Sequence, residues 1–232
     1  GSDNTAVGHA ALGANTTASC NTAVGRASLQ TNSTGAQSTA VGFQSLNANT
    51  TGSNNTAVGM CALKTNTTAA DNTAVGAFAL KLNETGTANT AVGTSALVKT
   101  TTGTNTAVGY AAAACTTTGF GTAVGYGAMK ANTTSSGNTA MGYQAMCAVT
   151  TGGNNTAFGL EALKTNISGA GNTAVGRDAL ELNTASNNTA VGFNALANNT
   201  TGHDLIAVGC GALFCNTTGP DNIAIGYQSQ YN

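Results

Sequence analysis

The stretch Asn4-Thr5-Ala6-Val7-Gly8 begins a short unit that the chain repeats to its end. The closing glycine of this unit occurs fourteen times, at intervals of 17 residues except for three intervals of 16. Its positions are Gly8, Gly25, Gly42, Gly59, Gly76, Gly93, Gly109, Gly125, Gly142, Gly159, Gly176, Gly192, Gly209 and Gly226. A fixed period of this length is typical of stacked repeats, in which each unit contacts its neighbours in sequence. The sequence therefore predicts a solenoid.

The repeat is already under way where the chain begins and is still running where it ends. We interpret residues 1–232 as one repeat domain that is a segment of a longer fibre protein. Gly1-Ser2 resembles a cloning remnant.

The composition excludes several classes of partner. Charged residues make up 6% of the chain and the formal net charge is -1, so no basic surface is expected to neutralise nucleic acid. The longest apolar runs, such as residues 110–115, are too short to span a membrane, and membrane insertion is not expected.

The six cysteines do not stack in adjacent repeats, which favours reduced thiols and assembly in a reducing compartment.

Alternation along the strand places the Thr and Val of each unit on one face and the Ala and Gly on the other. The Val position is Val in eleven copies and Met141, Phe158 or Ile225 in the others, and we expect this face to point inward. A Leu position four residues after the glycine, for example Leu63, is expected to fill the core from the opposite wall. These patterns predict an all-β fold, a parallel β-solenoid or β-roll of fourteen 16–17-residue repeats with two short strands per coil.

Two corners join the predicted walls. The invariant glycine indicates a backbone angle closed to other residues or a tight approach of backbone. The Asn-Thr-Thr-Gly corner, for example at residues 49–52, loses one residue in each 16-residue step and is expected to be the outer loop. Asn leads the strand in eleven of the fourteen copies, and these residues are expected to form ladders of stacked amides.

The Ala position of the strand has no exception in fourteen copies, although this reasoning places it on the outer face. We interpret it as the surface on which another copy of the chain packs closely. The predicted oligomer interface comprises Ala57, Ala74, Ala91, Ala107, Ala123 and Ala140.

Six of the eleven aromatic residues occupy the position directly after the conserved glycine. Stacking along a subunit seam and contact with sugar rings are both consistent with this arrangement. The candidate glycan contacts are Phe43, Tyr110, Tyr126, Tyr143, Phe193 and Tyr227.

Chemically reactive groups are sparse. His9 and His203 lie at opposite ends of the chain in different repeat positions, so we expect no metal site and no His-based catalytic arrangement. Glu161 and Asp178 share a position in neighbouring coils, as a carboxylate pair of a glycosidase would, but a convex solenoid offers no cleft for a substrate. We predict neither catalytic residues nor cofactors, and no enzymatic activity.

The segment Asn222-Ile-Ala-Ile-Gly-Tyr-Gln-Ser229 closely resembles the head repeat of trimeric autotransporter adhesins, which reads Ser-Val-Ala-Ile-Gly with a Ser two residues further on. The Asn-Thr-Ala-Val-Gly arrays also look like those in phage tail-fibre and tail-fibre-like proteins. The resemblance implies a left-handed parallel β-roll, three chains wide. The cysteines favour a phage-type fibre assembled in a reducing cytoplasm over a secreted adhesin, so the expected location is a virion tail fibre or an extracellular surface appendage.

We therefore expect a structural shaft or head segment of a homotrimeric fibre, which spaces and presents receptor-binding parts and makes weak contact with cell-surface glycans. The alternative is an ice-binding β-solenoid that uses a flat Thr/Ala face. Paired threonines such as Thr50-Thr51 and Thr67-Thr68 would align in ranks across the coils. Ice-crystal shaping would support this alternative, whereas a mass near three chains without ice activity would support the fibre.

Overall fold

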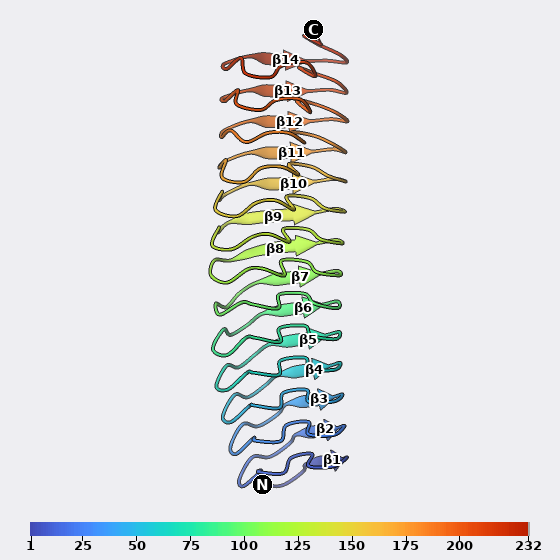
Figure 1. Ribbon diagram of the computed structural model, residues 1–232, viewed down its shortest axis with the longest axis vertical. Helices are drawn as coiled ribbons and strands as arrows, with labels where there is room; N and C mark the ends of the chain where they lie inside the picture. Colours follow the sequence, from blue (N-terminus) through green and yellow to red (C-terminus); the bar gives the residue numbers. More distant parts are fainter. Residues whose placement is uncertain (232) are drawn as a thin grey trace. The chain divides into compact units, whose positions relative to one another are not determined.

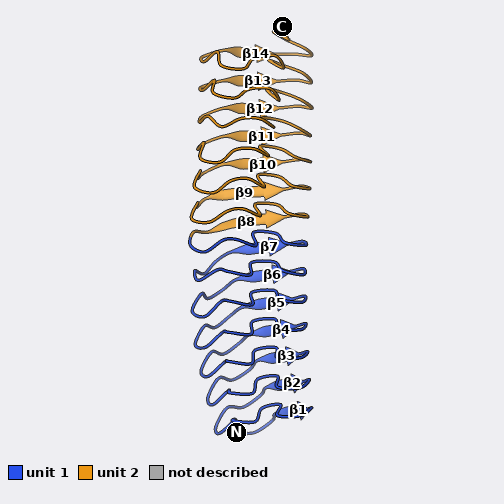
Figure 2. Cartoon of the chain, viewed as in Figure 1, with its two compact units in different colours: residues 1–118 blue, residues 119–232 orange. Residues whose placement is uncertain are grey.

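The computed structural model describes residues 1–231 and shows an all-β chain whose described residues contain no helix. No segment of these residues is therefore a helix that could cross a membrane. The chain divides into two compact units, Gly1–Thr118 and Gly119–Asn232, which Figure 2 shows in blue and orange. Each unit is a parallel β-solenoid, and the two are described separately.

Each coil contributes one short strand (Figure 1), and the repeating Thr-Ala-Val forms that strand in most coils. Unit 1 contains β1 (Thr5–Val7), β2 (Thr22–Val24), β3 (Thr39–Val41), β4 (Thr56–Val58), β5 (Thr73–Val75), β6 (Thr90–Val92) and β7 (Thr106–Val108). Unit 2 contains β8 (Gly121–Val124), β9 (Asn138–Met141), β10 (Thr156–Phe158), β11 (Thr173–Val175), β12 (Thr189–Val191), β13 (Ile206–Val208) and β14 (Ile223–Ile225).

Within each unit every strand pairs in parallel with the next strand in the sequence. The register places equivalent residues side by side, as in the pairs Ala40↔Ala57 and Val41↔Val58. Identical positions therefore form continuous columns along each unit. The prediction of a parallel β-solenoid is confirmed.

The prediction of which strand face points inward is wrong. Ala57 and Ala74 are fully buried, whereas Val58 and Val75 are each 36% exposed. The Thr of the strand lies on the same side as the Val, and its column is half-buried or exposed. The core is narrow because it is filled by two alanines and one leucine per coil, for example Ala57, Ala62 and Leu63 in the fourth coil. A column of Val in place of Ala would exceed this space.

The second wall carries the buried Leu column, as predicted, but it is not a second strand. Residues two and four positions after the glycine have positive φ, such as Cys61 (57°) and Leu63 (49°). This conformation interrupts the extended backbone, so the described residues contain one strand per coil and not two. Adjacent coils still bond through the backbone here, since the Leu63 N–H donates to the Ala79 carbonyl at 3.0 Å.

The conserved glycine is required for both of the reasons that the sequence indicates. Gly76 has a φ of 129°, which side chains disfavour, and a Cβ at this position would lie 2.6 Å from the carbonyl carbon of Gly93 in the next coil. The same close approach recurs from coil to coil, which explains why no copy carries another residue.

Two ladders of buried asparagines reinforce the stacking. The column that leads the strands was expected to form one, whereas the corner column was not singled out from the sequence. In the corner ladder, Asn66 Nδ2 donates to Asn49 Oδ1 at 2.9 Å, and Asn83 Nδ2 donates to Asn66 Oδ1 at 3.2 Å. In the ladder that precedes the strands, the Asn72 N–H donates to Asn55 Oδ1 at 3.0 Å. Buried amides are stable here because neighbouring coils provide their hydrogen-bond partners.

Candidate functional site

The most extensive candidate site is the outer face of the strands, which we call the Thr/Val face. In each unit it comprises the first and last residues of each Thr-Ala-Val motif and their replacements, in β1–β7 of unit 1 and in β8–β14 of unit 2. In unit 1, Val58, Val75, Val92 and Val108 are each 36% exposed. The result is a row of partly exposed apolar side chains that lie one coil apart.

The threonines of this face have free hydroxyl groups. Among the described residues, Thr39, Thr56 and Thr73 form no side-chain hydrogen bond. The threonines at the Asn-Thr-Thr corner differ, since Thr50 Oγ1 donates to the Thr67 carbonyl at 3.0 Å. The strand threonines are therefore available to an external partner or to water.

In unit 2 the Thr/Val face carries more apolar residues, and its side chains differ more in size. Met141 in β9 and Phe158 in β10 occupy the Val position of consecutive strands. Ile206 and Ile223 replace the Thr in β13 and β14 and are 39% and 63% exposed. The outer face accepts side chains of very different volume because it is not enclosed by the chain's own core.

The position after the conserved glycine adds a second exposed column, which contains the six aromatic residues singled out from the sequence. Their exposed fractions run from 42% to 75%. Tyr126 and Tyr143 stack with ring centroids 5.1 Å apart and an interplanar angle of 9°. Arg26 and Arg177 lie over the rings of Phe43 and Phe193 at 5.9 and 5.6 Å. The rings are accessible, and Tyr126 and Tyr143 stack on one another across neighbouring coils.

The predicted interface through alanines is wrong in this structure. Its six members are buried within the chain itself, with exposed fractions of 0% or 1%. They are Ala57, Ala74, Ala91, Ala107, Ala123 and Ala140. A second chain has no access to them, and their invariance reflects the narrow core.

The carboxylates of Glu161 and Asp178 are each held by a cation. Lys164 Nζ lies 2.9 Å from Glu161 Oε2, and Arg177 Nε lies 2.9 Å from Asp178 Oδ2. The hydrogen bond from Lys164 to Glu161 raises the pKa of the lysine. Each of the two carboxylates is therefore engaged in its own ion pair at the surface.

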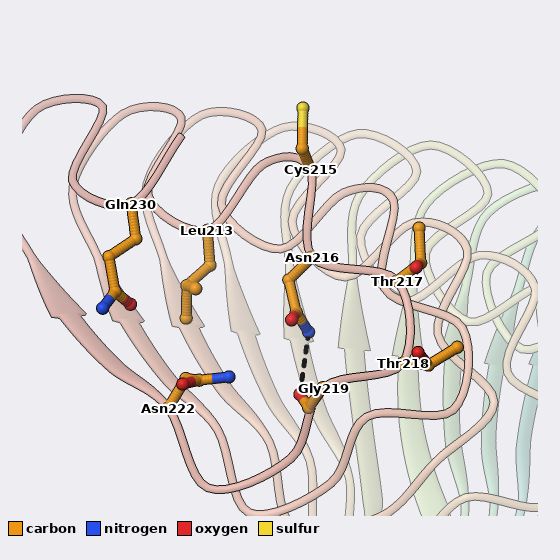
Figure 3. A pocket seen from close by; sticks show the side chains of 8 residues that line it. All are labelled: Leu213, Cys215, Asn216, Thr217, Thr218, Gly219, Asn222 and Gln230. Carbon is orange, nitrogen blue, oxygen red and sulfur yellow. Dashed lines mark hydrogen bonds between the residues drawn. The ribbon is translucent and has the colours of Figure 1, made fainter. Parts of the chain in front are cut away.

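Two hollows lie near the last coil of unit 2. The larger, about 410 Å³, is lined by the buried Leu213, by Asn216 and by exposed corner residues such as Thr217. Figure 3 shows these side chains. It lies at the corner of residues 216–219, over which the described residues place no further corner. The smaller, about 200 Å³, lies beside the stacked rings of Phe214 and Tyr231, whose centroids are 5.1 Å apart.

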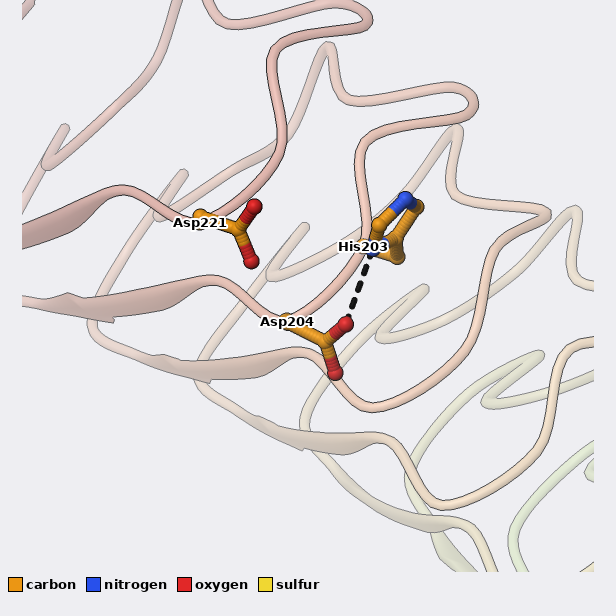
Figure 4. Close-up of side chains that lie close together, drawn as sticks. All are labelled: His203, Asp204 and Asp221. Atoms are coloured by element: carbon orange, nitrogen blue, oxygen red, sulfur yellow. Dashed lines mark hydrogen bonds and ion pairs between the residues drawn. The ribbon is translucent and has the colours of Figure 1, made fainter.

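One group of potential metal ligands was missed by the sequence reasoning. The side chains of His203, Asp204 and Asp221 offer ligand atoms that all lie within 4.8 Å of one another. Figure 4 shows the three side chains close together, on two neighbouring coils. Hydrogen bonds from His203 and then Asn187 lower the pKa of Asp204. His203 has no second histidine near it in the repeat, and its neighbours here are carboxylates. The 17-residue spacing of Asp204 and Asp221, one coil apart in the same position, was the available signal.

All six cysteines are unpaired thiols, and Cys61 is the one that is buried. Cys147 is half-buried, and desolvation by its surroundings raises the pKa of its thiol.

A scan against protein-family models found no match, and searches of curated proteins and of solved structures found none either. The function is therefore argued from the residues of the chain.

Proposed function

We propose that this chain is a structural segment of a fibre whose Thr/Val face packs against sister chains. The observation that carries the proposal is the row of exposed apolar residues on the only strand face that the coil leaves outside. Scattered apolar residues are normal on a protein surface, but a contiguous apolar row marks an interaction surface. A second copy is the simplest partner, since its face has the same repeat spacing.

The size variation along the face fits packing between chains. Met141 and Phe158 fall on consecutive strands, and the post-glycine column adds Tyr143 and Leu160 beside them. Large apolar side chains of mixed shape interdigitate well at subunit interfaces. The family resemblance adds the expectation of three chains around a common axis.

In this proposal the work of the chain is mechanical. Stacked coils space and present receptor-binding parts of a virion tail fibre or surface appendage. Post-glycine aromatics left outside the seam contact cell-surface sugars weakly, and repetition along the fibre raises their combined affinity. The reduced thiols suit assembly in a reducing cytoplasm.

The test is the mass of the particle in solution. Sedimentation of the wild-type chain should give a multiple of the chain mass, with three copies expected. The triple variant Val58→Glu/Val75→Glu/Val92→Glu places stacked charges on the Thr/Val face without entering the core, so it should remain folded and sediment as a monomer.

The matched control is Thr51→Glu/Thr68→Glu/Thr85→Glu, which places the same three charges on exposed corner residues with the same spacing. This control should assemble like the wild type. A monomeric wild-type chain, or a Val58/Val75/Val92 variant that stays assembled, would show that the face is not a subunit seam.

Ice binding is the second candidate, and the free strand threonines favour it. Hydroxyls and Val methyl groups recur at one strand spacing, about 4.8 Å, on an open strand face. The relevant face is thus Thr/Val and not the Thr/Ala face expected from the sequence. Ice shaping by a wild-type monomer that is lost on Thr56→Lys would establish this candidate, whereas an assembled wild type without ice activity favours the fibre.

A further inference from the structure

The group formed by His203, Asp204 and Asp221 spans two consecutive coils of unit 2. Asp204 precedes β13 by two residues, and Asp221 holds the same position before β14. Both have the left-handed backbone conformation, with φ of 56° and 58°. The Asp221 N–H donates to the His203 carbonyl at 3.1 Å, so the backbone fixes the relative position of the two coils.

This group contains two carboxylates and only one basic side chain. The stacking brings two carboxylates to neighbouring positions, where like charges repel each other. Among residues 1–231, neither Asp204 nor Asp221 forms an ion pair with a lysine or arginine. His203 Nδ1 lies 2.8 Å from Asp204 Oδ2, which leaves the Asp221 carboxylate facing the pair without a basic partner of its own.

We propose that His203, Asp204 and Asp221 bind a divalent transition-metal cation of the Zn²⁺ type, which links the two coils. The set supplies one imidazole nitrogen and two carboxylate oxygens, three protein ligands that leave further positions to water. All three ligand atoms converge within 4.8 Å. Ligand bonds of about 2.0–2.2 Å require the atoms to approach more closely, and the exposed side chains are free to do so.

The ligand chemistry distinguishes this class of ion from the alkaline-earth cations. Imidazole suits Zn²⁺, Co²⁺ and Ni²⁺, whereas Ca²⁺ and Mg²⁺ prefer sets made only of oxygen. The bound ion would replace the hydrogen bond between His203 and Asp204 with two metal bonds, and it would neutralise Asp221 at the same time. Occupancy therefore stabilises the contact between the last two strands of the unit.

The test uses the intact chain with Co²⁺ as the probe, read by its visible absorption, followed by competition with Zn²⁺. One Co²⁺ per chain should bind with a spectrum of nitrogen and oxygen ligation, and Zn²⁺ should displace it while Ca²⁺ and Mg²⁺ do not. Thiolate charge-transfer bands would instead assign the metal to cysteines such as Cys210 and overturn the proposal.

The decisive variants are Asp221→Asn and His203→Gln. Each removes a direct ligand and should weaken binding by more than the roughly tenfold that loss of an outer-shell partner costs. The matched control is Asp71→Asn, at the same repeat position but next to Asn54 and not to a second carboxylate. Hydrogen exchange at the Asp221 amide should slow on addition of Zn²⁺ in the wild type and the control only. Equal affinity of all four proteins, or displacement of Co²⁺ by Ca²⁺, would contradict the site.

Discussion

The corner ladder of asparagines allows the most detailed prediction about stability. Asn66 is fully buried and donates from Nδ2 to Asn49 Oδ1 at 2.9 Å and to the Ala69 carbonyl at 3.0 Å. Its own Oδ1 accepts from Asn83 Nδ2 at 3.2 Å. The substitution Asn66→Ala removes all three bonds, but the neighbouring groups are not affected equally.

Two of the three former partners retain another hydrogen bond. The Ala69 carbonyl still accepts from Asn55 Nδ2 at 2.8 Å, and Asn83 Nδ2 still donates to the Gly86 carbonyl at 2.9 Å. Asn49 Oδ1 alone is left without a donor. A single buried acceptor without a partner costs about 1–3 kcal/mol, and this sets the expected loss in free energy of unfolding.

Urea unfolding followed by circular dichroism measures this loss, provided that the slope of the transition is unchanged. The control is Thr68→Ala in the same corner, because Thr68 is exposed and its side chain forms no hydrogen bond with any described residue. If both variants unfold at the same urea concentration as the wild type, the ladder does not stabilise the stack and this reasoning is refuted.

Two further predictions concern single positions. Gly76→Ala should destabilise unit 1 strongly because its Cβ would meet the Gly93 backbone at 2.6 Å. Gly13→Ala, where the nearest atom lies at 3.3 Å, should lower the temperature of thermal unfolding much less. The raised pKa of Cys147 leaves less reactive thiolate at a given pH. Iodoacetamide should therefore modify Cys147 more slowly than the exposed Cys20, and the rate at Cys147 should rise only at higher pH; equal rates by mass spectrometry would contradict this.

The period and the parallel stacking could be predicted from the sequence because they depend only on repetition. Every coil buries its apolar residues against copies of itself, so equivalent residues must align. The 17-residue spacing of the glycines and the asparagine columns were sufficient for this. The role of the invariant glycine could also be predicted, because a position that excludes every side chain indicates a constraint on the backbone.

Hydrophobicity alone could not predict which face of the strand points into the interior. Alternation groups Thr with Val and Ala with Gly, but a three-residue strand does not show which pair points inward. The range of side-chain sizes found at a repeat position is a better indicator of whether that position points inward. A position that holds Val, Met141, Phe158 and Ile225 cannot lie in a core of constant width, whereas the invariant Ala can.

The second wall was interpreted as a strand because its Leu column is regularly buried. The left-handed conformations two and four residues after the glycine prevent this. Gly127, Asp178, Asn194 and Gly211 occupy the first of these positions, and Gly, Asn and Asp are the residues that adopt it most readily. The candidate metal ligands were missed for a different reason, because they come together only when coils are superimposed.

Adjacent residues of β5 provide the most direct test of the account, which holds that alanines line the interior and valines form the outer seam. Ala74→Glu would bury an unpaired carboxylate and should abolish the folded structure of its coils, whereas Val75→Glu should remain folded and lose only self-association. Circular dichroism combined with sedimentation of the two variants distinguishes these effects. A folded, monomeric Ala74→Glu variant beside an unfolded Val75→Glu variant would contradict the account.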